Sequence, residues 1–175
     1  MKVVTNAGPL VALSKLGLIH LLPAIYDAVL IPVLVHEEVV TRGLERQQSD
    51  AYAIQLAVAR HYLTVVQLAT TDLSAAIQAL PIHPGEKQAI ELALREKPDW
   101  LLLDDLLARD HARRMGLKVK GTLGVIVAAY RQRLVNLQEV ELIFHAIQNR
   151  EDIWINDKLI ERVWDQLSSE AKGKQ

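Results

Sequence analysis

The residues with the clearest chemical potential lie in the segment GEKQAIELALREKPDWLLLDDLLARDHARR, which runs from Gly85 to Arg114. Glu86 opens a helical pattern, and Asp104 and Asp105 follow a strongly apolar run. Carboxylates within a few ångström of one another repel unless a cation neutralises them. A hard divalent cation with oxygen ligands, Mg²⁺ or Mn²⁺, is the usual partner, and it activates water for attack on a phosphodiester. The segment therefore suggests half of a metal site.

Each of these acids also has an ordinary structural explanation. A glutamate at a helix start, such as Glu86, is favoured by the helix dipole by about 0.3–1 kcal/mol. Asp104 could be no more than the N-cap of the following helix, and Asp105 its first-turn charge. Each of these signals is weak alone. Their combination in one chain favours a site that the acids share.

Short apolar runs alternate with longer helical patterns along the chain. The apolar runs are continuous rather than alternating, which predicts strands buried on both faces, at Lys2–Thr5, Ala28–Ile31, Thr64–Val66, Trp100–Leu103 and Lys118–Lys120. The helical patterns cover Pro9–Leu16, Val33–Arg42, Ser49–Arg60, Asp72–Ala79, Glu86–Glu96, Leu106–Met115, Leu123–Arg133, Leu137–Asn149 and Asp157–Ser169. This order predicts a three-layer α/β/α sandwich with a mainly parallel central sheet of about five strands. We expect one domain over residues 1–170 and a frayed tail over residues 171–175.

Polar residues gather after the ends of the predicted strands, where ligands bind in such sheets. Asn6 follows the first strand, and the helix after the second strand carries Glu37 and Glu38. These two glutamates are neighbours on a helix, so at most one of them points into a site. Thr122 lies in the turn GTLG after the fifth strand.

The composition limits the classes of function. The formal net charge of the 175 residues is −1, so no global basic field recruits nucleic acid, and such a partner needs a local patch. The chain has no cysteine, which removes disulfides and thiolate zinc sites and fits a reducing cytoplasm. No uninterrupted apolar run approaches the roughly 20 residues of a membrane span. The histidines show no HxxxH or HxH spacing, and neither GxGxxG nor GxxxxGK[ST] occurs.

Five segments, in this order and spacing, resemble the PIN-domain family, the nuclease fold of VapC-type toxins. They are VVTNAGPLVALSKLG, IPVLVHEEV, GEKQAIELAL, DWLLLDDLLAR and GLKVKGTLGVI. The resemblance covers almost the whole chain and is nearest to a branch of small PIN-like proteins of poorly defined function. It implies hydrolysis of single-stranded RNA with Mg²⁺ or Mn²⁺ held by three or four acids.

The resemblance also assigns the acids by motif. They fall at Asn6, Glu38, Glu86 and Asp104 or Asp105, with Asp104 slightly favoured because it ends the strand, while Thr122 matches a hydroxyl that supports the cluster. Glu38 is preferred to its neighbour because it directly precedes an apolar pair. Asn6 departs from the family, whose first acid is an aspartate. An amide oxygen can ligate a metal but adds no charge, so we expect weak metal binding and low or absent activity.

Basic residues follow the aspartates. Arg109 and Arg113 are four residues apart and share a helix face, where they could contact RNA phosphates. The alternative is a solvated face on which Asp110 pairs with an arginine. The leading hypothesis is thus a cytoplasmic, toxin-like endoribonuclease, with a cognate antitoxin and self-association as expected partners. The rival hypothesis is a catalytically silent PIN-like module that binds RNA or a protein.

Overall fold

The computed structural model describes residues 1–172, which form two compact units. The first unit is Met1–Thr122, and the second begins at Leu123. Compactness alone does not make the second unit an independent domain, so a single domain over residues 1–170 stays a prediction. Of the predicted frayed tail, residues 171–172 continue the last helix, and residues 173–175 lie outside the described part of the chain.

The first unit is built on an all-parallel sheet with the strand order β3-β2-β1-β4-β5. The strands are β1 (Lys2–Thr5), β2 (Ala28–Pro32), β3 (Thr64–Val66), β4 (Trp100–Leu102) and β5 (Val119–Lys120). Val3, Val4, Leu101 and Leu102 in the two central strands are almost completely buried. Strands covered on both faces read as continuous apolar runs, which is why their positions could be predicted.

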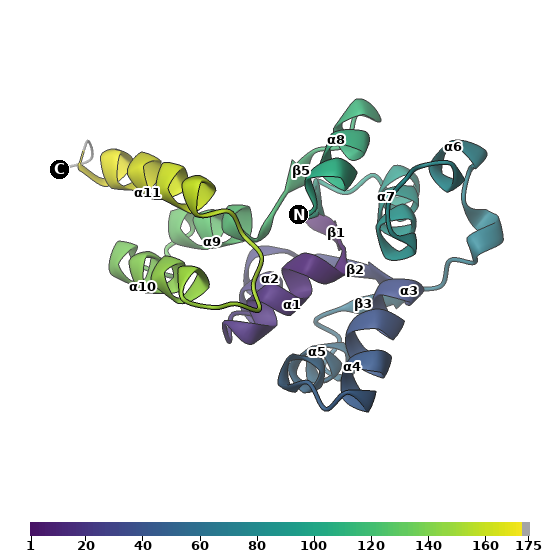
Figure 1. Cartoon of the computed structure of the whole chain (residues 1–175), viewed down its shortest axis with the longest axis horizontal. Coiled ribbons are helices and arrows are strands. Elements are labelled where there is room, and N and C mark those ends of the chain that lie inside the picture. The colour runs from purple at the N-terminus through teal and green to yellow at the C-terminus, as the bar shows by residue number, and fades with distance from the viewer. Residues whose placement is uncertain (173–175) are drawn as a thin grey trace. The chain divides into compact units, whose positions relative to one another are not determined.

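Helices connect the strands on both faces of the sheet, giving the predicted α/β/α sandwich (Figure 1). They are α1 (Ala7–Lys15), α2 (Leu21–Ile25), α3 (Val33–His36), α4 (Arg42–Glu45), α5 (Ser49–Ala59), α6 (Ala75–Gln78), α7 (Pro84–Glu96) and α8 (Leu106–Arg114). The chain moves from β1 outward to β3, then returns to β4 and moves outward in the opposite direction to β5. Because parallel crossovers are right-handed, the two sets of helices cover opposite faces, and the order reverses between β1 and β4.

Three local features differ from the sequence prediction. The predicted helix Val33–Arg42 contains a π-helical turn, Glu37–Thr41, between α3 and α4. The predicted helix Asp72–Ala79 is instead a 3-10 turn, Thr70–Asp72, followed by the short α6. Helix α2 was not predicted, because LLPAI is only five residues long and carries a proline. All three are short segments whose conformation depends on tertiary packing more than on periodicity.

The second unit is helical. It contains most of α9 (Thr122–Arg131), then α10 (Leu137–Gln148) and α11 (Asp157–Lys172). Asn136 caps α10, since its Oδ1 accepts the backbone N–H of Glu139 at 2.9 Å. Phe144 and Trp164 meet edge to face with ring centroids 6.4 Å apart, which joins α10 to α11.

Candidate functional site

The first residue of the candidate site, Asn6, lies where the strand order reverses. Its backbone N–H donates to the carbonyl oxygen of Leu102 at 3.1 Å, so β1 and β4 are held together at their carboxyl ends. Asn6 occupies the N-cap position of α1, yet its side chain makes no capping hydrogen bond. The side chain is 7% exposed, and its Oδ1 is buried with no hydrogen-bond partner among residues 1–172. A buried, unpaired acceptor costs about 1–3 kcal/mol, so this oxygen is available to a water molecule or a cation.

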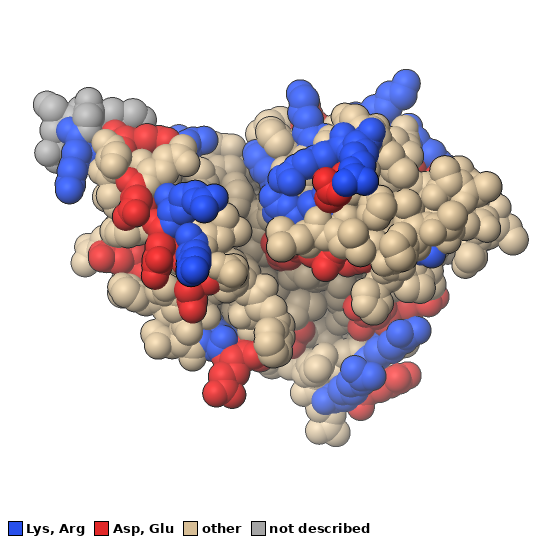
Figure 2. All heavy atoms as spheres, turned by 45° about the horizontal axis from the view of Figure 1, so that its top comes forward, with Lys and Arg blue, Asp and Glu red and all other residues tan. Residues whose placement is uncertain are grey.

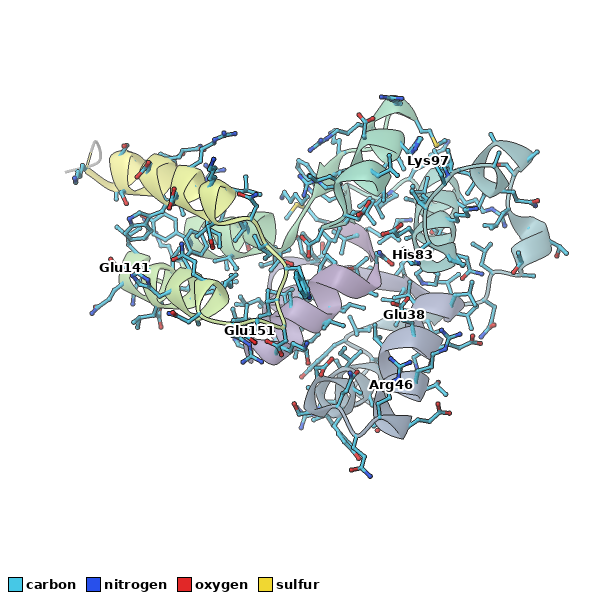
Figure 3. The ribbon with its side chains drawn as sticks, viewed as in Figure 1. Glu38, Arg46, His83, Lys97, Glu141 and Glu151 are labelled. Carbon is cyan, nitrogen blue, oxygen red and sulfur yellow. The ribbon has the colours of Figure 1, made fainter. Side chains whose placement is uncertain are left out.

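Glu38 faces Asn6 across the start of α7. A Cβ atom at Gly85 would lie 3.2 Å from Glu38 Oε2 and 3.5 Å from Asn6 Oδ1. Both oxygens therefore approach the same backbone position, and the missing side chain of Gly85 leaves room for them. Figure 3 shows Glu38 on the helix that follows β2, near His83 at the start of α7. The π-helical turn carries Glu38, and such turns are frequent at functional sites.

Glu86 lies in the first turn of α7, and its carboxylate does two things. Its Oε2 accepts the backbone N–H of His83 at 2.9 Å, which stabilises the helix start. Burial raises the pKa of Glu86, and the negative charges of Asp105 and Glu38 raise it further, against the opposing hydrogen bond from His83. The charges of Asp105 and Glu38 therefore reach Glu86, which places the three carboxylates near one another.

Asp104 and Asp105 have different surroundings. Both carboxylate oxygens of Asp104 are bonded to Thr122, with Oδ1 accepting the backbone N–H at 2.7 Å and Oδ2 the hydroxyl at 2.6 Å. Burial raises the pKa of Asp104, while Thr122 and the charge of Arg109 oppose this shift. Asp105 is the N-cap of α8, since its Oδ1 accepts the backbone N–H of Ala108 at 2.8 Å. Asp105 is thus a cap whose charge also reaches Glu86.

Two glycines allow backbone to approach Asp104 closely. A Cβ at Gly8 would lie 3.4 Å from Asp104 Oδ2, so the start of α1 contacts this carboxylate. A Cβ at Gly121 would lie 2.7 Å from Asp104 Oδ1 and 2.5 Å from a terminal guanidinium nitrogen of Arg109, which leaves no space for a side chain. Asp104, two residues after β4, is therefore enclosed by backbone at the starts of α1 and α9.

The two arginines predicted to contact phosphate differ in exposure. A terminal nitrogen of Arg109 donates to the carbonyl oxygen of Leu103 at 3.1 Å, and burial lowers the pKa of Arg109, as does the charge of Arg113. Arg113 is exposed. Asp110 pairs with Arg114 at 2.6 Å rather than with either of them. Figure 2 shows basic side chains gathered over the part of the first unit where α8 lies.

The polar atoms of the site are of the type that a hard cation prefers. Carboxylate and amide oxygens are the usual ligands of Mg²⁺ and Mn²⁺, and Asn6 Oδ1 is an acceptor without a donor. The residues therefore fit a divalent cation by chemistry. In residues 1–172 no three His, Asp or Glu side chains already converge at metal-ligand distances.

Sequence reasoning missed two residues on α7 near Glu86. They are Gly85, which directly precedes it, and Gln88, in the second turn of the helix. A glycine directly before an acid at a helix start is a signal of close backbone approach, and it could have indicated Gly85. Nothing in the sequence alone indicates the partners of Gln88.

Comparisons with known proteins bear on the family. A family model described as "PIN domain" matches residues 2–169. Neither the curated proteins nor the solved structures give a match. No helix within residues 1–172 is long and apolar enough to cross a membrane. Since the family model spans nearly the whole length, and the all-parallel sheet agrees with it, the chain belongs to the PIN-domain family.

Proposed function

We propose that the chain is a metal-dependent endoribonuclease of the PIN type, which hydrolyses phosphodiester bonds of single-stranded RNA. The cofactor is Mg²⁺ or Mn²⁺, and the activity is reduced because Asn6 stands where the family has an aspartate. The single observation that carries the proposal is the buried Oδ1 of Asn6, which has no partner in the described residues although it sits at a cap position.

Four side chains hold the cation in this proposal. Glu38 and Glu86 contribute carboxylates from the two helices that meet at Gly85, and Asp105 contributes charge from the start of α8. Asn6 contributes a neutral carbonyl oxygen. When bound, the metal would lower the pKa of a water ligand and offset the charge of the phosphodiester. Its affinity is weakened because one of four formal charges is absent.

The remaining residues of the proposed site orient a carboxylate and attract RNA phosphates. Thr122 fixes both oxygens of Asp104, so this carboxylate keeps one orientation beside the metal-holding set. Arg109 and Arg113 supply positive charge beside the acids, and such charge favours a phosphate backbone even though the whole chain carries a net charge of −1. A cognate antitoxin and self-association stay predictions.

Calorimetric titration of the full chain with Mn²⁺ tests the proposal. We expect binding by the parent protein, and loss of binding in Glu86→Ala, in Glu38→Ala and in the double variant Asp104→Ala/Asp105→Ala. Glu37→Ala is the matched control, because Glu37 is the exposed neighbour of Glu38, and its titration should equal that of the parent. Cleavage of a labelled single-stranded RNA with Mn²⁺, and its arrest by a chelator, then tests the reaction.

A silent module is the second candidate, favoured by the neutral Asn6 and the near-zero net charge. It predicts no Mn²⁺ binding by the parent, together with RNA binding that persists in the presence of chelator. That pair of results would replace the enzyme proposal.

A further inference from the structure

Gln88 is a polar side chain in the interior of the first unit. It lies on α7, two residues after Glu86, and is only 1% exposed. Both ends of its amide are used: Oε1 accepts the backbone N–H of Leu34 at 3.1 Å, and Nε2 donates to the carbonyl oxygen of Leu68. One buried side chain thus ties α7 to two other segments of the chain.

The bond to Leu34 lies at the start of α3. The first backbone N–H groups of a helix have no partner inside the helix and require one from elsewhere. Gln88 supplies that partner for Leu34. The helical stretch that begins with α3 continues through the π turn to Glu38, so the bond fixes the N-terminal end of the element that carries this carboxylate.

Gly85 and Gln88 lie on the same face of α7. Residues three apart are neighbours on a helix surface. A Cβ at Gly85 would lie 3.5 Å from Val35 Cγ2 and 3.2 Å from Glu38 Oε2, so Gly85 allows α3 to approach α7 closely. One turn further along, Gln88 sets where along α7 that approach occurs.

We infer that Gln88 is a positioning residue of the metal site, which sets the spacing between the carboxylates of Glu38 and Glu86 through its bond to Leu34. The inference rests on the proposed function, since it concerns the same site. Gln88 touches no reacting group. Its effect on the site passes through the contact between α3 and α7 at Leu34, Gly85 and Gln88, which we call the seam. Outer-shell groups that hydrogen-bond a metal ligand directly are commonly worth about 10–100-fold in metal affinity, and Gln88 acts one step further out, through Leu34.

The test compares Gln88→Met, which keeps the side-chain length but makes neither hydrogen bond, with Gln78→Met. Gln78, which is exposed, is the control for loss of an amide hydrogen bond elsewhere, because its Nε2 also donates to a backbone carbonyl, that of Leu73 at 2.8 Å, on α6. We expect Gln88→Met to weaken Mn²⁺ binding about tenfold or more in calorimetry, and Gln78→Met to leave it unchanged. Amide exchange measured by NMR without metal should be faster at Leu34 in Gln88→Met only.

The outcomes separate the two ideas. If the parent binds no Mn²⁺, the proposed function fails and this inference fails with it. If the parent binds and Gln88→Met binds equally well, while Leu34 exchanges faster, Gln88 is merely structural and the inference alone is overturned.

A measurement on the parent protein covers the case in which Gln88→Met does not fold. Coupling between two sites is reciprocal, so saturating Mg²⁺ should slow amide exchange at Leu34 if the seam and the metal site are linked. An exchange rate at Leu34 that is the same with and without bound Mg²⁺ would overturn the inference.

Discussion

Asp104 accepts both side-chain and backbone donors of Thr122, with distances of 2.6 Å to the hydroxyl and 2.7 Å to the N–H. The two residues follow neighbouring strands, β4 and β5. The two hydrogen bonds between them fix the end of one strand against the end of the other. They also satisfy a backbone N–H in the first turn of α9, where N–H groups have no partner inside the helix. Thr122 is completely buried, so water cannot replace its hydroxyl.

Replacing Thr122 by valine tests this pair. Valine keeps the shape but removes the hydroxyl, and hydrogen bonds to charged groups contribute about 1.5–3 kcal/mol. We expect the free energy of unfolding, measured by urea denaturation at pH 7, to fall by about that amount. Thr122→Ser, which retains a hydroxyl, should lose less. A loss of stability in Thr122→Ser without any loss in Thr122→Val would show that packing of the methyl group, rather than the hydrogen bond, is responsible.

Asp105 combines a cap and a charge, and two substitutions separate them. Asp105→Asn keeps a good N-cap but removes the charge, whereas Asp105→Ala removes both. We expect Asp105→Asn to retain the parent's stability and to weaken Mn²⁺ binding. Asp105→Ala should weaken binding similarly and also lose about 1 kcal/mol of stability. Unchanged Mn²⁺ binding in Asp105→Asn would mean that Asp105 is only a helix cap. Asp104 would then be the aspartate of this pair that serves the metal site.

The sheet, and the positions of Glu86 and the aspartate pair at the ends of elements, were predictable because their signals are local. The strands stand out as apolar runs, and Glu86 and the aspartate pair stand directly at a helix start and a strand end. The geometry that joins them was not predictable, because it depends on tertiary contacts. Three features arise only when distant segments pack together. They are the missing capping bond at Asn6, the π turn that contains Glu38, and the two hydrogen-bond partners of Gln88.

Stability without metal should depend on the charge of Glu86. Its pKa is raised in the folded state, chiefly by burial, so the folded chain holds this proton more tightly than the unfolded chain. Glu86 therefore contributes most to the free energy of unfolding below its ordinary pKa of 4.5. This contribution is lost as the pH rises through the pKa that Glu86 has in the folded chain. Asp104 acts in the same direction from its ordinary value of 3.8.

Glu86→Gln isolates this effect, since glutamine can still accept the N–H of His83. In urea unfolding with chelator between pH 4 and pH 7, we expect the parent to lose stability relative to Glu86→Gln as pH rises. Parallel curves for the two proteins would contradict the raised pKa. The same variant should bind Mn²⁺ more weakly, because a ligand charge is gone.

Restoring the family's aspartate at position 6 should have opposite effects on binding and on stability. Asn6→Asp adds a fourth charge to the site, so Mn²⁺ binding should tighten and RNA cleavage should increase. Without metal, the same charge is buried beside other carboxylates, so the free energy of unfolding should fall at pH 7 and recover with saturating Mn²⁺. If neither affinity nor cleavage changes, Asn6 lies outside the metal site.

Gly85→Ala probes the closest approach in the site without removing any polar group. Gly85 is the second residue of α7 and has no positive φ, so its backbone accepts alanine and the substitution should not unfold the protein. Its Cβ would lie 3.2 Å from Glu38 Oε2, which is tighter than ordinary contact. Glu38 is exposed and can move away by a few tenths of an ångström, so the cost falls on the position of its carboxylate rather than on the fold.

We therefore expect Gly85→Ala to keep or raise the melting temperature while it weakens Mn²⁺ binding. Gly17→Ala is an unsuitable control, because Gly17 has a φ of +72° and alanine would be strained there. Lys87→Ala is a better one, since Lys87 lies in the same turn of α7 but sends its amino group to the carbonyl of Gln78. Binding that is unchanged in Gly85→Ala would mean that the carboxylate of Glu38 tolerates displacement, and hence that its contact with Gly85 does not set the geometry of the site.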